Sequence, residues 1–438
     1  MRESLGGEYS MTSSASRRSS RRLWRTLGLF VVATGVFASA GFRGQQPVFR
    51  SVVDLIAVDV QVVDPDGNPV EKIGPERFEV SINGQKRKVV SAQFIRHNQG
   101  LKDSEPVPVA PPSDKNPSPE PTTGRTFILA IDSGSFTVGS ERAAIEAARA
   151  FVDHLDPDDR LGLYVYPIGT QVAPTTTRAT VRAKLENIVG EKQYIPSHYH
   201  LKPFEVVDIT AQSTNPNSFL TSGRGSLSSA ALDPVLKIQQ RECPGDTDCP
   251  IRIYSEGVLL ATELEHQSEM SLGGLQTLLR TLADIPGRKS VVIVSAGVLV
   301  SDRLDGRPDV GDVGKTMGQN AARANANVYT LHIDAVQSPI SAAVDGSGDL
   351  EFGRDRALYG NWLNQFSAAA GGKLIYVPVG RPDYAFDRVL RETSAYYLLG
   401  VEPAQADRDG RPRELKVKVD QRGVTVRNRQ WVVIPAKS

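Results

Sequence analysis

The sequence predicts an α/β protein in which a mainly parallel sheet carries helices on both faces and smaller β segments flank it at each end. Between residues 125 and 400, short apolar runs alternate with stretches whose apolar residues repeat at helical spacing. This alternation is typical of parallel sheets that are covered on both faces. Outside that region, apolar and polar residues alternate one by one, which is the period of a half-buried strand. A length of 438 residues suits two or three domains at roughly 150 residues each.

Residues 1–40 predict an export signal. Five arginines between Arg17 and Arg25 precede the apolar stretch 27–40, and this stretch is shorter than the roughly 20 residues that a membrane-spanning helix needs. We expect cleavage near Ala40, after which no stable membrane span remains. The run SRRLWR loosely resembles a twin-arginine signal. An uncleaved N-terminal anchor is the alternative, and in both cases the folded part is periplasmic or extracellular.

Residues 50–98 and 401–438 predict β structure at the two ends of the folded part. Valines alternate with polar residues in LIAVDVQVV, and Asn83-Gly84 is a strong hairpin signal. We expect the first segment to form a small module of the sandwich kind, and the C-terminal segment to pair with it. Between this module and the α/β region, residues 99–124 form a Pro-rich linker that cannot build a core.

The α/β domain is expected to span residues 125–400. Its predicted strands are FILAI, LGLYVYPI, SVVIVS, VYTLHID and KLIYVPV, and its predicted helices cover residues 140–155, 177–190, 272–285, 313–327, 360–370 and 383–395.

Residues 192–270 interrupt the alternation and predict a long polar insertion with some helix around residues 230–240. The two cysteines of the chain, Cys243 and Cys249, lie in this insertion. In an oxidising compartment they predict a disulfide that closes a small loop. Two free thiols are the alternative, whereas a zinc site would need histidine partners that the spacing does not supply.

Ligands of an open α/β sheet bind at the carboxyl ends of its strands. The candidate positions are therefore Asp132 to Ser135, the run 295–297 and Asp334. The sequence after FILAI contains no glycine-rich phosphate loop, so a nucleotide cofactor is not expected. It also contains no G-x-S-x-G motif, so a hydrolase triad is poorly supported.

The run IDSGS after the first strand resembles the Asp-x-Ser-x-Ser start of the von Willebrand factor A domain. The resemblance covers residues 125–400 in the order of elements. Two flanking regions are similar to the von Willebrand factor A-related family described from Acidobacteria. The first is GNPVEKIGPERFEVSINGQKRKV near the start, and the second comprises AAAGGKLIYV, YYLLGVEP and DGRPRELKVKV near the end. The resemblance implies a von Willebrand factor A-like, Rossmann-like fold and a protein partner.

Metal-binding members of that family hold Mg²⁺ through an aspartate, two hydroxyls, a threonine and a second aspartate. The resemblance implies Asp132 and Ser135 as ligands here, with Ser133 as the alternate hydroxyl. Counted from Asp132, however, the two hydroxyl positions are occupied by Gly134 and Phe136. If the loop is extended, neighbouring residues point in opposite directions, so the hydroxyls are out of phase with the acid.

The second aspartate of the family pattern is replaced by Ala296, and the insertion covers the position of the threonine. Four acids of the following loop, Asp302, Asp305, Asp309 and Asp312, could substitute, although a solvated acidic loop is the simpler interpretation. His198 and His200 could share a strand face, but the sequence places no partner ligand beside them. We therefore expect no cofactor, with Mg²⁺ as the one alternative.

These patterns favour an exported, non-enzymatic protein-binding protein of the adhesion or interaction kind, with a degenerate metal-ion-dependent adhesion site. A structural envelope protein without ligand binding is the main alternative, and a metal-assisted hydrolase ranks last. The net charge of +1 gives no electrostatic footprint for nucleic acid.

Overall fold

The computed structural model describes residues 55–97, 124–211, 234–333, 349–377 and 382–436, all of which lie in one compact unit. The predicted signal segment, nearly all of the Pro-rich linker and Asp334 lie outside the described residues. The α/β class is confirmed: the chain contains a mostly parallel six-stranded sheet with helices, together with an antiparallel sheet.

The six-stranded sheet has the order β6-β5-β4-β7-β8-β9. All neighbouring pairs are parallel except β5 and β6. The strand β6 was not predicted; it contains Pro174, which an edge strand tolerates because one side of it needs no ladder hydrogen bonds. The strands are β4 (Thr126–Asp132), β5 (Arg160–Tyr166), β6 (Gln171–Thr175), β7 (Lys289–Ser295), β8 (Ala326–Ile333) and β9 (Leu374–Val377).

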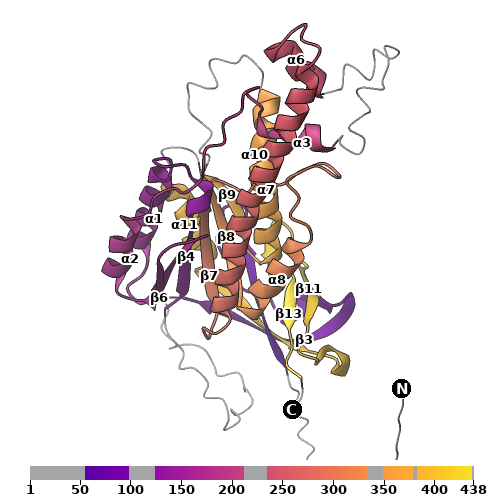
Figure 1. The fold of residues 1–438 in the computed structure, drawn as a ribbon. Helices are drawn as coiled ribbons and strands as arrows, with labels where there is room; N and C mark the ends of the chain where they lie inside the picture. Colours follow the sequence, from indigo (N-terminus) through magenta and orange to yellow (C-terminus); the bar gives the residue numbers. More distant parts are fainter. Residues whose placement is uncertain (1–54, 98–123, 212–233, 334–348, 378–381, 437–438) are drawn as a thin grey trace, which may run out of the picture. The chain divides into compact units, whose positions relative to one another are not determined.

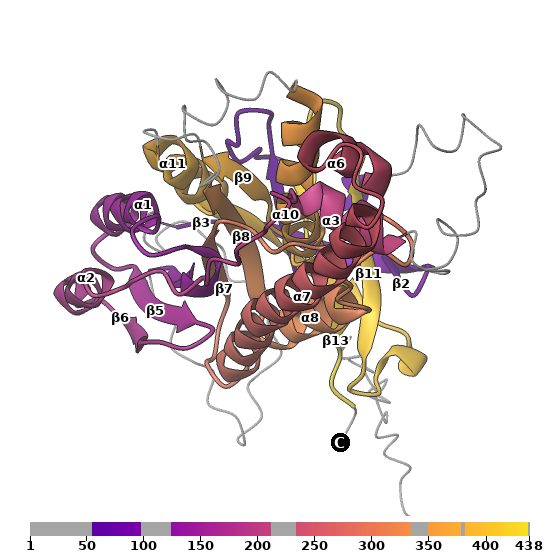
Figure 2. The ribbon, with the colours of Figure 1, turned by 45° about the horizontal axis from the view of Figure 1, so that its top comes forward.

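Helices cover both faces of this sheet (Figures 1 and 2). Alternate residues of β4 face opposite sides: Leu129 packs with one group of helices and Ala130 with the other. This is the burial on both faces that continuous apolar strands predict. The first group is α1 (Arg142–His154), α2 (Arg178–Leu185) and α11 (Pro382–Glu392); the second is α7 (Cys249–Leu282), α8 (Val313–Arg323) and α10 (Asp349–Ala369).

The second sheet is antiparallel and has the order β12-β1-β10-β3-β2-β11-β13. The two ends of the chain pair within it, β2 with β11 and β1 with β12. In the described part these strands form one sheet rather than the two facing sheets of a sandwich. The strands are β1 (Ile56–Val63), β2 (Phe78–Ile82), β3 (Gln85–Arg96), β10 (Ala395–Glu402), β11 (Pro412–Val419), β12 (Thr425–Arg427) and β13 (Trp431–Val433).

Strand β10 lies between β1 and β3 in this sheet, so the expected boundary between residues 400 and 401 falls inside a strand. Tyr397, Leu399 and Val401 alternate along β10 and are buried in the core of the antiparallel sheet. Because apolar side chains alternate along β10, this strand has one apolar face, and that face packs into the core of the antiparallel sheet. The α/β region and the two ends of the chain are therefore interdependent.

A polar seam joins the two sheets. The amide of Gln61 donates to the carbonyl oxygen of Glu392 at 3.1 Å and accepts from the Tyr329 hydroxyl at 2.8 Å. Beside it, Asp59 lies 3.4 Å from Arg429 and 3.7 Å from Arg288. We refer to Asp59, Arg288 and Arg429 as the Asp59 cluster. Because its side chains are only 10–13% exposed, each charge depends on its partners for compensation.

The insertion is more helical than the sequence suggested. It contains α3 (Pro203–Ala211) and α6 (Pro234–Glu242), and α7 begins within it at Cys249. The helix expected over 272–285 is therefore the last part of one 34-residue helix. Residues 256–270, EGVLLATELEHQSEM, are mostly good helix formers, which explains why the helix does not break at residue 270. Within the described ranges, no helix is long and apolar enough to cross a membrane.

Candidate functional site

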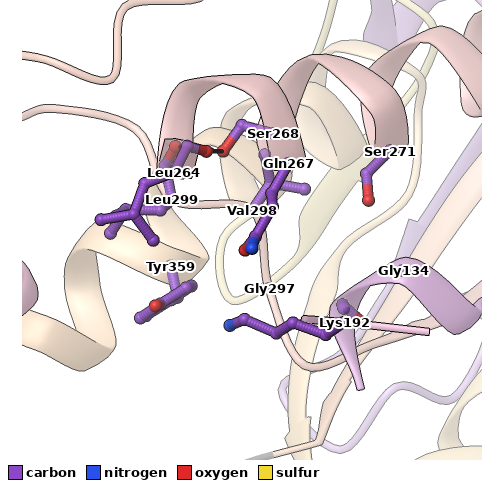
Figure 3. A pocket seen from close by; sticks show the side chains of 11 residues that line it. Gly134, Lys192, Leu264, Gln267, Ser268, Ser271, Gly297, Val298, Leu299 and Tyr359 are labelled. Atoms are coloured by element: carbon purple, nitrogen blue, oxygen red, sulfur yellow. Dashed lines mark hydrogen bonds between the residues drawn. The ribbon is translucent and has the colours of Figure 1, made fainter. Parts of the chain in front are cut away.

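The candidate site is a pocket at the carboxyl ends of β4 and β7. These neighbouring strands lie in the middle of the sheet order, where the connections run toward opposite edges, and such a switch point is where open α/β sheets bind ligands. The pocket encloses about 280 Å³ when its open mouth is included. Figure 3 shows the lining residues, which are Gly134, Ser135, Lys192, Leu264, Gln267, Ser268, Ser271, Gly297, Val298, Leu299 and Tyr359.

Asp132 ends β4 next to the pocket and is fully buried. Ser271 on α7 donates its hydroxyl hydrogen to Oδ1 of Asp132 at 2.9 Å, and Ser295 at the end of β7 donates to Oδ2 at 2.8 Å. Burial raises the pKa of Asp132 from 3.8 to about 6, and the two serine hydroxyls and the charge of Lys192 limit that rise. The carboxylate is thus held by two hydroxyls from different elements.

The predicted hydroxyls Ser133 and Ser135 hold main-chain groups. Residues 133–135 form the 3-10 turn η2 rather than an extended loop, so alternation along a strand does not decide where these side chains point. Ser135 donates to the main-chain oxygen of Asp132 at 2.8 Å and accepts from the amide of Ala296 at 2.9 Å. The Ser133 hydroxyl lies 2.9 Å from the Tyr166 carbonyl oxygen and 3.1 Å from Glu191 Oε2.

The turn after β7 fits closely against α10. Gly297 has a φ of 113° and its amide donates to the Ser295 hydroxyl at 2.9 Å. A Cβ at this position would lie 2.6 Å from the Cβ of Tyr359, so the turn needs glycine for both its backbone angle and its packing. Ala296, at the position where the sequence resemblance implies a second acid, uses its amide rather than a side chain to connect this turn to η2.

Lys192 brings a positive charge into the pocket. Its amide donates to the Phe136 carbonyl oxygen at 2.9 Å, which ties the segment after α2 to the end of η2. Its ammonium lies over the Tyr359 ring, 4.8 Å from the centroid. No sequence pattern predicts Lys192 or Ser271 as site residues, because both stand at the edges of the predicted insertion and not at the strand ends where ligands of an open α/β sheet bind.

The side chains around Asp132 are a poor fit to a divalent ion. Mg²⁺ prefers a near-octahedral set of oxygens with carboxylates among them. Here the one buried carboxylate already accepts from two serines, and an ammonium shares the pocket. Among the described residues, no group of three or more histidines, cysteines, aspartates or glutamates is placed to hold a metal. The metal role of Asp132, Ser133 and Ser135 stays a prediction.

The acidic loop after β7 has other contacts. Asp302 pairs with Arg354 of α10 at 3.0 Å, and the amide of Asp309 donates to Glu265 of α7 at 3.0 Å. Asp312 stands at the N-cap position of α8, where its side chain makes no capping hydrogen bond. Among the described residues, no hydrogen bond or ion pair joins these acids, or Asp305, to Asp132. The loop is thus tied to the neighbouring helices, and the substitute ligands considered from the sequence do not come to the pocket.

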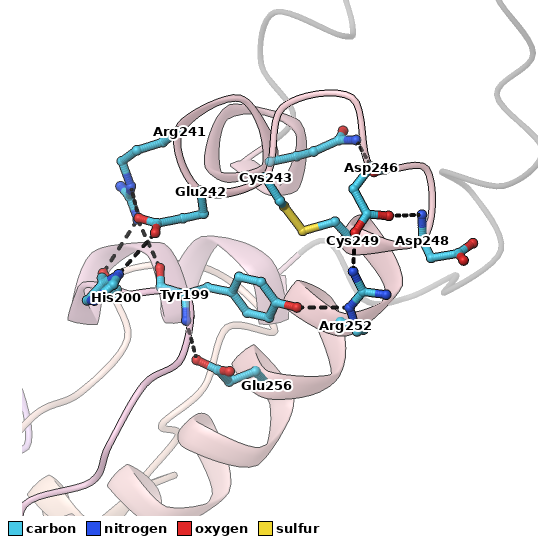
Figure 4. Close-up of a disulfide and its surroundings, with 11 residues drawn as sticks. Tyr199, His200, Arg241, Glu242, Cys243, Asp246, Asp248, Cys249, Arg252 and Glu256 are labelled. Atoms are coloured by element: carbon cyan, nitrogen blue, oxygen red, sulfur yellow. Dashed lines mark hydrogen bonds and ion pairs between the residues drawn. A yellow bond between two sulfur atoms is a disulfide. The ribbon is translucent and has the colours of Figure 1, made fainter.

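The predicted disulfide between Cys243 and Cys249 is present (Figure 4). It joins the end of α6 to the first residue of α7. Nearby, His200 lies 3.0 Å from Glu242, and the Tyr199 hydroxyl accepts from Arg252 at 3.0 Å. These contacts hold the segment around residue 200 against α6 and the start of α7.

Comparisons with known proteins give weak matches. No model of a known protein family and no curated protein matches the sequence. Among solved structures, an aerotolerance-related membrane protein from Bacteroides fragilis and the conserved hypothetical protein BatB from Bacteroides thetaiotaomicron are similar. Each match has 12% identity and a TM-score of 0.28, and covers 61% of this chain and 98% of the other. Similarity of this degree assigns no function.

Proposed function

We propose that this protein is an exported, non-enzymatic binding protein whose von Willebrand factor A-like domain recognises a protein partner. The observation that carries the proposal is the pocket at the β4–β7 switch point, which five separate segments of the chain line. The recess is small and partly open to solvent, so it suits the tip of one side chain of a partner better than a drug-sized ligand. Export is supported by the signal pattern of residues 1–40 and by the disulfide, which persists in oxidising compartments.

The serines of the pocket support binding rather than catalysis. Ser135, Ser268 and Ser271 each donate to an oxygen of the protein itself. A nucleophilic serine needs a general base within hydrogen-bonding reach. The carboxylate that Ser271 contacts, Asp132, is fully buried and also accepts from Ser295, and in the described part no histidine is hydrogen-bonded to these serines. Their hydroxyls fix the shape of the pocket.

A structural envelope protein without a ligand is the second candidate. The observation that favours it is the satisfied state of Asp132, whose two carboxylate oxygens both accept from serines of the same chain. On this alternative, Asp132 serves to join β4, β7 and α7, and the pocket has no occupant.

Site-specific photo-crosslinking in the envelope of the native cell distinguishes these functions. A photoreactive side chain at Gln267, which lines the pocket, should yield an adduct with one defined partner. The same side chain at Arg280, exposed near the C-terminal end of α7, is the matched control and should give no such adduct. Equal adducts at both positions, or none, would refute partner recognition through the pocket. Hydrolytic turnover that survives repurification and is lost in Asp132→Ala would refute the non-enzymatic assignment.

A further inference from the structure

The ammonium of Lys192 has unused hydrogen-bonding capacity. Figure 3 shows its side chain crossing the pocket below Gln267, with the nitrogen toward Tyr359. A lysine ammonium carries three N–H donors. Apart from the contact with the face of the Tyr359 ring, no hydrogen bond or ion pair of this ammonium is made with the described residues. These donors are therefore available to a ligand.

The main chain at this lysine and at the residue before it is fixed to η2 and the residue that follows η2. The amide of Glu191 donates to the Ser133 carbonyl oxygen at 2.9 Å, and that of Lys192 donates to the Phe136 carbonyl oxygen at 2.9 Å. The ring of Tyr359 then supports the cation from the α10 side through a cation–π contact. A charge held in this way loses little conformational freedom on binding, which favours affinity.

We infer that Lys192 is the fixed cation of this pocket and that the pocket binds a single carboxylate group of a protein partner without a divalent ion. This inference rests on the proposed function, because it names the partner chemistry that the same pocket takes. It also explains the poor fit to Mg²⁺: the positive charge at this strand edge comes from the chain itself.

The charges around the pocket favour a monoanion. One ammonium supplies one positive charge, and the buried Asp132 next to the pocket, when ionised, repels a doubly charged phosphate about twice as strongly as a single carboxylate. The lining also includes the apolar side chains of Leu264, Val298 and Leu299, against which the methylene groups of a glutamate can pack. A glutamate or aspartate side chain combines these two properties.

The test titrates N-acetylglutamate α-amide, which has one carboxylate, into the purified full protein and follows the side-chain amide of Gln267 by NMR. N-acetylglutamine α-amide is the uncharged control, and inorganic phosphate is the doubly charged one. We expect saturable shifts with the glutamate compound that are unchanged by EDTA or added Mg²⁺. Lys192→Met should weaken binding roughly tenfold or more, whereas Lys192→Arg should retain it.

Equal binding of the glutamine compound, tighter binding of phosphate, a requirement for Mg²⁺, or full binding by Lys192→Met would each overturn the inference. Thermal unfolding of both variants shows whether they are folded. Repeating the Gln267 crosslink in Lys192→Met separates the two proposals. A partner adduct that persists without carboxylate binding refutes the role of Lys192 but leaves partner recognition standing. Lysine-dependent carboxylate binding without any adduct supports the anion site and refutes the protein partner.

Discussion

Replacing Asp132 by asparagine should stabilise the protein progressively more as the pH rises. The pKa of Asp132 is raised from 3.8 to about 6 by burial, so the folded state holds the proton more tightly than the unfolded chain. Stability from this group is fully present below pH 3.8 and is lost as the pH rises through about 6. At about 1.4 kcal/mol per pKa unit, the loss amounts to about 3 kcal/mol.

Asparagine keeps the shape of the side chain and does not ionise. The difference in the free energy of unfolding between D132N and the wild type should therefore grow by about 2.5 kcal/mol between about pH 4 and about pH 7.5, since a small part of the loss has already occurred at the lower pH. Any constant difference between an amide and a protonated carboxyl cancels in this comparison. Urea unfolding at a series of pH values measures it, and NMR titration of the Asp132 carboxyl carbon measures the pKa itself.

Val138→Ala is the control, because this side chain is exposed and carries no ionisable group; its difference from the wild type should stay nearly constant with pH. A D132N difference that is equally flat, or a measured Asp132 pKa at or below 3.8, would show that the serine hydroxyls and Lys192 outweigh burial. The physical description of the site would then be wrong.

Three further predictions concern stability. Replacing Cys243 and Cys249 together by serine removes a disulfide that spans six positions and should cost about 2 kcal/mol; hydrogen exchange should rise in α6 and the start of α7 but not in the parallel strands. Asp59→Ala leaves the two arginines of the Asp59 cluster without their carboxylate and should lower the free energy of unfolding by about 3 kcal/mol. A decrease below about 1 kcal/mol, measured by urea unfolding, would contradict the burial of this cluster between the two sheets. Phe151→Ala empties a fully buried site between two phenylalanine rings at 4.8 and 5.4 Å and should cost about 3–5 kcal/mol, as thermal or urea unfolding can measure.

The sequence by itself determined the class of fold and the position of Asp132. Continuous apolar runs and alternating β segments report directly on which faces are buried, so the strand that ends at Asp132 could be located from its own residues. The disulfide followed from two cysteines at a short spacing and an export signal.

Only the tertiary structure decided which side chains meet at the strand ends. Ser271 and Lys192 come from 139 and 60 positions farther along the chain than Asp132, and their approach depends on the path of α7 and on the hydrogen bond from Lys192 to Phe136. Strand β10 lies in the antiparallel sheet for a similar reason, since its partners are β1 and β3 from the other end of the chain. Periodicity reports which face of a segment is buried, but the partner of that face is fixed by long-range packing, which no local pattern contains.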